Sequence, residues 1–140
     1  MQKLNGSIRS SAFMALAMGI FLPILETIRR SNQILNPKYF IHWFDDYLLG
    51  AILLIAALMV FRQKKNASLY LVAAWGMAAG TLLMSFLYQI DLYFNPGVEP
   101  GVFSKDIVAL VKGLIVAYTW IGLWKSIQAQ QEEVKSEGEK

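Results

Sequence analysis

The sequence predicts an all-α integral membrane protein, built as an antiparallel bundle of four transmembrane helices. Hydrophobic residues make up 56% of the chain and charged residues only 16%, which is more apolar and less charged than soluble domains usually are. The charged residues are also segregated, because they gather near the ends of long apolar runs and in the C-terminal segment. Four such runs, joined by short links, predict one transmembrane domain over residues 1–128 and a polar, acidic tail over residues 129–140.

The first helix is expected over residues 10–29. Lys3 and Arg9 precede its apolar run, an arrangement that signal peptides and signal anchors share. A cleavable signal needs small residues directly after the apolar run, but residues 25–30 read LETIRR. The sequence therefore favours a retained transmembrane helix. Residues at four-residue spacing form a small-residue stripe for close helix contact: Ser11, Ala15 and Gly19.

The second helix is expected over residues 37–62. Its uncharged run, Tyr47 to Phe61, covers only ~22 Å of a hydrocarbon core that is ~30 Å thick. To span the membrane, the helix must carry Asp45 and Asp46 into one edge of the bilayer, where a charge costs about 2.5–3.5 kcal/mol at full depth. Other groups must therefore compensate for these carboxylates.

The third helix is expected over residues 67–94, because a tight turn with Lys64 and Lys65 precedes a long uncharged run. This run contains the segment GMAAG, residues 76–80, whose glycine spacing is typical of helices that approach each other closely in lipid. The pattern therefore predicts a contact face on this helix.

The fourth helix is expected over residues 104–127. Its uncharged run of roughly 18 Å is also too short to span a membrane, so Lys112 must enter the bilayer. Counted from the opposite interface, Lys112 lies ~10 Å below the near boundary, which is farther than its side chain reaches. We therefore expect Lys112 to pair with a carboxylate of the second or first helix, Asp46 or Glu26.

The distribution of lysine and arginine in the short loops predicts the orientation. One side of the membrane holds Lys3, Arg9, Arg62, Lys64, Lys65 and Lys125. The other side holds Arg29, Arg30, Lys38 and Lys105. The larger number on the first side predicts that both termini are cytoplasmic, in a plasma or inner membrane.

With this topology, charged residues from all four helices gather in the outer third of the bundle. The expected ligand-binding residues are Glu26, His42, Asp45, Asp46, Asp91 and Lys112. Charges inside membranes usually pair, so a structural ion-pair network accounts for part of this set. The set nevertheless holds more carboxylates than one lysine needs, and ionisable groups inside a membrane are functional candidates by default.

This excess of carboxylates predicts a pocket that binds or passes a small cationic or protonatable ligand. A lipid-modifying membrane enzyme is an alternative, with His42 and the carboxylates as general acid and base. A third interpretation is an accessory subunit of a larger membrane complex, in which the ion pairs are purely structural. The expected partners are membrane lipid and either further copies of the chain or a larger complex. The sequence leaves the ligand, the oligomeric state and the choice among these roles open.

The composition also excludes several kinds of chemistry. The chain has no cysteine, so disulfides, thiolate nucleophiles and thiolate metal sites are excluded. Its single histidine excludes a bis-histidine haem within one chain. No catalytic residue, metal ligand or cofactor is assigned. The net charge of +3 comes from cations dispersed through short loops, which argues against a nucleic-acid partner.

Overall fold

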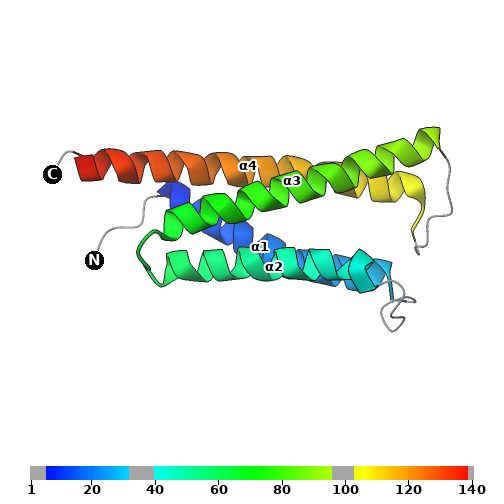
Figure 1. Ribbon diagram of the computed structural model, residues 1–140, viewed down its shortest axis with the longest axis horizontal. Coiled ribbons are helices and arrows are strands. Elements are labelled where there is room, and N and C mark those ends of the chain that lie inside the picture. The colour runs from blue at the N-terminus through cyan, green and yellow to red at the C-terminus, as the bar shows by residue number, and fades with distance from the viewer. Residues whose placement is uncertain (1–5, 32–39, 96–102, 139–140) are drawn as a thin grey trace.

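The computed structural model describes residues 6–31, 40–95 and 103–138, apart from the side chains of residues 40–43, 93 and 137. These residues form four helices, α1 (Gly6–Arg29), α2 (Phe40–Phe61), α3 (Ala67–Phe94) and α4 (Lys105–Gly138) (Figure 1). All four are long and apolar enough to cross a membrane. The all-helical prediction is therefore confirmed, and the spans suggest a multi-pass membrane protein. The expected start of the second helix at residue 37 lies outside the described residues.

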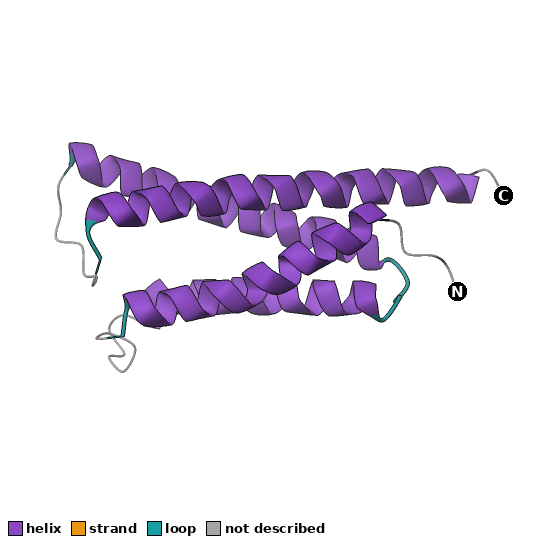
Figure 2. Cartoon of the chain, turned by 180° about the vertical axis from the view of Figure 1, so that it is seen from behind, coloured by secondary structure: helices purple, strands orange, loops and turns teal. Residues whose placement is uncertain are grey.

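The helices are arranged in a ring that follows the order of the chain. α1 packs most extensively on α2 and α3 on α4, while contacts of α1 with α4 and of α2 with α3 close the ring. The start of α1, the α2–α3 turn and the end of α4 lie at one end of the molecule (Figure 1). At the other end, the α1–α2 pair and the α3–α4 pair lie apart in both views (Figures 1 and 2). The two helix pairs therefore diverge toward that end.

Small residues dominate the interior, and large apolar residues face outward. The buried residues include Ala12, Ala15, Ala56, Ala57, Ala74, Ala78 and Ala79. The exposed residues include large apolar side chains from every helix, such as Phe21, Ile55, Met84 and Leu110. A soluble protein rarely leaves so much apolar surface open to water, whereas small residues at helix contacts and apolar residues toward lipid are typical of membrane bundles.

α1 and α2 cross in direct backbone contact. A Cβ atom at Gly50 would lie 2.8 Å from the carbonyl oxygen of Gly19 and 2.9 Å from Cγ of Pro23. A Cβ atom at Gly19 would lie 2.6 Å from Cγ of Leu54. The crossing therefore requires glycine on both helices. The residues expected to form a stripe on the first helix are all buried: Ser11, Ala15 and Gly19.

The glycines of the GMAAG segment face away from the bundle. Gly76 and Gly80 are exposed, and no described atom lies within 4 Å of a Cβ atom built at either position. Their neighbours Ala78 and Ala79 are buried instead. The expectation of close helix contact is therefore wrong for these two glycines within the chain. A helix that is apolar on all sides does not reveal from its sequence which face turns inward.

Trp75 connects α3 with α1 and α4. Its side chain is fully buried, and its Nε1–H donates a hydrogen bond to Oγ of Ser11 at 2.9 Å. The Ser11 hydroxyl in turn donates to the carbonyl oxygen of Gly122 at 3.0 Å. A Cβ atom at Gly122 would overlap the indole ring. These hydrogen bonds satisfy the polar groups of Trp75 and Ser11 and connect the three helices. Because Gly122 has no side chain, α4 leaves room for the indole ring.

α4 continues well past its apolar run and ends at Gly138, although a separate polar tail was expected from residue 129. Ala129 is buried, and the Ser68 hydroxyl donates a hydrogen bond to the carboxylate of Glu133. This part of α4 therefore packs against the first turn of α3. The final residues, 139–140, lie outside the described part of the chain.

Candidate functional site

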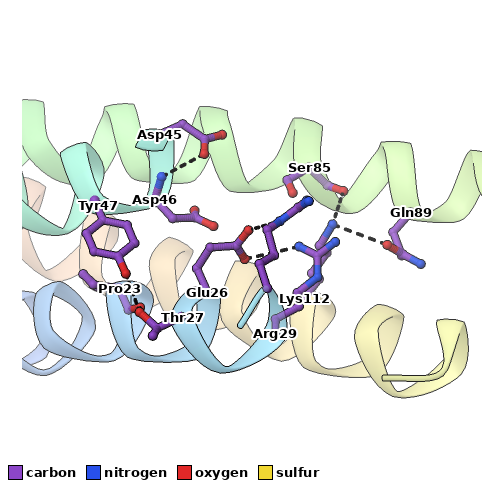
Figure 3. A network of polar contacts seen from close by, with 11 residues as sticks. Pro23, Glu26, Thr27, Arg29, Asp45, Asp46, Tyr47, Ser85, Gln89 and Lys112 are labelled. Atoms are coloured by element: carbon purple, nitrogen blue, oxygen red, sulfur yellow. Dashed lines mark hydrogen bonds and ion pairs between the residues drawn. The ribbon is translucent and has the colours of Figure 1, made fainter. Parts of the chain in front are cut away.

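A cavity of about 190 Å³ lies at the end of the bundle where α1 ends and α4 begins. All four helices contribute to its lining, α1 and α4 most of all. Its polar lining residues are Glu26, Arg29, Asp46, Ser85 and Lys112. The rest of the lining is apolar and includes Leu22, Leu25, Ile107 and Val111. The cavity thus combines an apolar wall with a charged cluster, which Figure 3 shows from close by.

Glu26, in the last turn of α1, is bound by the two arginines that follow it. Its side chain is only 4% exposed. Nη1 of Arg29 lies 3.3 Å from Oε2 of Glu26, and Nε of Arg30 donates a hydrogen bond to Oε1. Residues three and four positions apart lie on one face of a helix, which explains why both guanidinium groups reach the same carboxylate. The charge of Glu26 is therefore compensated from its own end of α1.

Lys112 extends from α4 toward α3. Its Nζ donates hydrogen bonds to the carbonyl oxygen of Ser85 at 3.2 Å and to Oε1 of Gln89 at 3.4 Å. Gln89 is completely buried. The sequence led us to expect a carboxylate partner, Asp46 or Glu26. Lys112 interacts electrostatically with Asp46, and the two hydrogen bonds given above end on uncharged groups of α3. The sequence analysis does not identify Ser85 and Gln89 as site residues. The pattern that points to them is two polar residues four positions apart in a long uncharged run.

Asp46 is the residue through which α2 lines the cavity. Its carboxylate interacts electrostatically with Glu26, Arg29 and Lys112, and also with Asp45. No residue in the described part of the chain donates a hydrogen bond to this carboxylate or forms an ion pair with it. Asp45 itself is exposed and accepts a hydrogen bond from the backbone N–H of Asp46 at 2.9 Å. Of these two neighbouring carboxylates, Asp46 is the one that lines the cavity.

A hydroxyl contact fixes α2 against α1 beside this carboxylate. The Thr27 hydroxyl donates a hydrogen bond to the carbonyl oxygen of Pro23 at 2.6 Å and also contacts the hydroxyl of Tyr47 (Figure 3). Tyr47 follows Asp46 directly in α2. Together with the Gly19–Gly50 crossing, this contact sets how far Asp46 lies from Glu26.

The remaining expected site residues do not line the cavity. Asp91 is exposed and accepts a hydrogen bond from Nδ2 of Asn95 at 3.0 Å. Asp45 is exposed next to Asp46. His42 belongs to the first turn of α2, but its side chain lies outside the described residues. The structure therefore brings together Glu26, Asp46 and Lys112, and adds Arg29 to them.

The charges that line the cavity are balanced. Two carboxylates, Glu26 and Asp46, stand opposite two cations, Arg29 and Lys112. The excess of carboxylates expected from the sequence is not found in the lining, because Asp45 and Asp91 turn outward. Within the described residues, no group of three histidine, aspartate or glutamate side chains could hold a metal ion. The arrangement is suited to binding a charged group that is attached to an apolar body.

Comparison with protein-family models, with curated proteins and with solved structures finds no match to this chain.

Proposed function

We propose that this chain is an integral membrane protein that binds or passes a small cationic or protonatable ligand in the cavity between its helix pairs. Its four helices cross the membrane in alternating directions, as an antiparallel bundle. Both termini are cytoplasmic, in a plasma or inner membrane, so the cavity lies in the outer third of the bundle. The four apolar spans and the lysine and arginine distribution support this topology.

The proposal rests on the surroundings of the Asp46 carboxylate. Glu26 is compensated by two arginines, and Lys112 donates to uncharged oxygens of α3. Asp46 lines the same cavity, and no described residue donates a hydrogen bond to its carboxylate. A carboxylate in a poorly solvated site is stabilised by a cation that comes close and donates hydrogen bonds to it. An ammonium group of a ligand supplies both the charge and the hydrogen bonds.

The shape and lining of the cavity define the rest of the ligand. Apolar residues of α1 and α4, among them Leu25, Ile107 and Val111, form most of its wall. Its volume of about 190 Å³ is smaller than the ~300 to 1,000 Å³ of most small-molecule sites. The ligand is therefore a small amphiphile, with a protonated amine at Asp46 and an apolar body against the aliphatic side chains.

An accessory role in a larger membrane complex is the second candidate, and one observation favours it. Gly76 and Gly80 form an exposed small-residue face on α3 that no other described helix uses. In that role the arginine pairs of Glu26 would serve structure alone. The lipid-modifying enzyme gains no support, because the side chain of His42 lies outside the described residues.

Binding of octylamine to the purified protein in lipid nanodiscs tests the proposal, with empty nanodiscs subtracted to remove partitioning into lipid. We expect the parent to bind octylamine, and Asp46→Asn to weaken binding at least ten-fold, about 1.4 kcal/mol. Asp45→Asn is the matched control, because it removes the exposed neighbouring carboxylate, and it should bind like the parent. Equal affinity of Asp46→Asn and the parent would overturn the proposal.

A further inference from the structure

We infer that the cavity opens sideways into the lipid between α1 and α4, and that its ligand is a long-chain amine of the outer leaflet whose chain extends through this opening. The inference rests on the proposed function, because it starts from an amine at Asp46 in a membrane-spanning bundle. It goes further by naming the source of the ligand and the route by which the ligand enters.

The cavity follows α1 and α4 over about two turns of each helix. Its lining extends from Leu22 to Arg29 on α1 and from Ile107 to Ile115 on α4, stretches of ~10 Å and ~12 Å. In the described part of the chain, α2 contributes Asp46, and α3 contributes Leu82 and Ser85. Because α1 and α4 are neighbours in the ring of helices, the cavity is an elongated slot between these two helices, with α2 and α3 on its inner side.

α1 and α4 are in contact away from the cavity. The Ser11 hydroxyl donates a hydrogen bond to the carbonyl oxygen of Gly122, and Nζ of Lys125 donates one to Oγ of Ser10, each at 3.0 Å. From this contact, α1 diverges from α4 toward its own C-terminal end (Figure 2). The two helices are therefore joined beyond one end of the slot and lie apart along it.

Apolar residues of α4 line the cavity and are also exposed on the outside of the bundle. The exposed fractions are 45% for Phe103, which lies just before α4, 52% for Ile107 and 37% for Val111. On the α1 side of the slot, Leu25 is partly exposed. An enclosed cavity would bury its lining. The wall of this cavity is therefore incomplete between α1 and α4, and the edge of the opening is apolar.

The surface beside the opening is apolar too, because Phe21 and Ile28 of α1 and Leu114 of α4 are exposed. Val111 directly precedes Lys112, which the residue count places ~10 Å below the outer boundary of the membrane. The opening thus reaches the depth of the hydrocarbon core. A solute that enters from water favours a polar entrance at the membrane surface, whereas an apolar edge at this depth admits an alkyl chain from the lipid.

The size of the cavity fits this arrangement. Its volume of about 190 Å³ is below that of most small-molecule sites. With an open side, this volume limits only the enclosed part of the ligand, which is the amine and the first carbons of its chain. The rest of the chain stays in the lipid. Transfer from water to an apolar medium favours each CH₂ group by about 0.8 kcal/mol, so a long-chain amine already resides in the membrane and reaches Asp46 from there.

Competition between amines of different chain length tests the inference in phosphatidylcholine nanodiscs, with radiolabelled octylamine as the bound ligand. Octadecylamine mixed into the lipid should displace octylamine at least ten-fold more effectively than a two-chain quaternary ammonium lipid, which gives the disc the same charge. Equal displacement by the two would show that the cavity is closed to long chains; the inference would fail and the octylamine site would stand. If octylamine itself does not bind to the parent, the proposed function fails.

Photolabelling locates the chain in the parent protein. Octadecylamine with a diazirine in the middle of its chain reacts, on irradiation, with the groups around the chain. Labelling that is lost in Asp46→Asn comes from amine bound at the site. We expect this labelling on the segments that flank the opening, residues 21–28 of α1 and 107–114 of α4. Site-dependent labelling on α2 and α3 alone would overturn the route, and so would labelling that does not depend on Asp46.

A tryptophan in the opening tests the same route by obstruction. Val111→Trp places a large ring between α1 and α4 and should reduce the site-dependent labelling at least ten-fold. Leu110→Trp is the matched control, because Leu110 is the neighbouring residue, is exposed and lies outside the lining. It should be labelled like the parent, and circular dichroism checks that both variants are folded. Equal labelling of the two folded variants would overturn the inference. If Val111→Trp does not fold, the labelling pattern of the parent decides.

Discussion

Replacing Gly50 by alanine tests the contact that fixes α1 against α2 and, with it, one wall of the cavity. The added methyl group would lie 2.8 Å from the carbonyl oxygen of Gly19 and 2.9 Å from the Pro23 ring. A backbone carbonyl and a proline ring cannot rotate away, so the two helices must separate. Overpacking of this kind costs about 1–3 kcal/mol. The better helix propensity of alanine offsets roughly 0.5–1 kcal/mol of that cost, so we expect a net loss of up to about 2.5 kcal/mol.

Gly76→Ala is the matched control for this substitution. It makes the same chemical change on an apolar helix, but no described atom lies within 4 Å of the new methyl group. We therefore expect Gly76→Ala to be neutral or to stabilise the protein by up to about 1 kcal/mol. Unfolding by SDS in mixed micelles, followed by tryptophan fluorescence, measures both variants. A Gly50→Ala protein as stable as Gly76→Ala would refute the close crossing.

The same pair of variants links the fold to the site. Asp46 precedes Gly50 by one helical turn, so separating α2 from α1 moves its carboxylate relative to Glu26. Octylamine affinity should therefore fall in Gly50→Ala and stay at the parent value in Gly76→Ala. Unchanged affinity in a destabilised Gly50→Ala protein would show that the position of Asp46 does not depend on the crossing.

Two further predictions concern packing and topology. Gly122→Ala should destabilise the protein, because its methyl group would overlap the Trp75 ring; overpacking costs about 1–3 kcal/mol before the better helix propensity of alanine is subtracted. Gly113→Ala is its control on the same helix, since the nearest contact there is an ordinary 3.4 Å, and equal stability of the two variants would contradict the packing. In this cysteine-free chain, Asn66→Cys should react with a membrane-impermeant thiol reagent from the cytoplasm and Ser104→Cys from the outside. Labelling of Ser104→Cys from the cytoplasm alone would reverse the orientation.

The helices themselves were predictable, because long uncharged apolar runs have few structural alternatives. The turn before α3 also had a local signal. Asn66 adopts a left-handed conformation with φ 61°, which asparagine tolerates better than most residues. The sequence left open whether the segment after Lys125 is a solvated helix or a disordered end, since the end of an apolar run marks the edge of a membrane span and not the end of a helix. The segment that follows contains alanine, glutamine, glutamate and lysine, which continue a helix readily.

The sequence indicates the level of each charged residue along its helix, but not the direction in which its side chain points. Counting residues along each helix placed Glu26, Asp46 and Lys112 at one level, and all three line the cavity. The same count placed Asp91 there too, yet it is exposed. Lipid and protein interior are both apolar, so the hydrophobic pattern contains little information about which face of a helix turns inward. For the same reason, the sequence did not predict that Lys112 would reach α3.

A crystal structure grown in a lipidic mesophase with an octylamine that carries a terminal bromine tests the central claim most directly. Anomalous scattering locates the bromine, and the density between bromine and protein locates the amine. We predict the amine nitrogen within ~3 Å of the Asp46 carboxylate and the chain along the apolar wall of α1 and α4. Bromine found only in the surrounding lipid, with Asp46 paired directly to Lys112 or Arg29 and the cavity closed, would contradict the account.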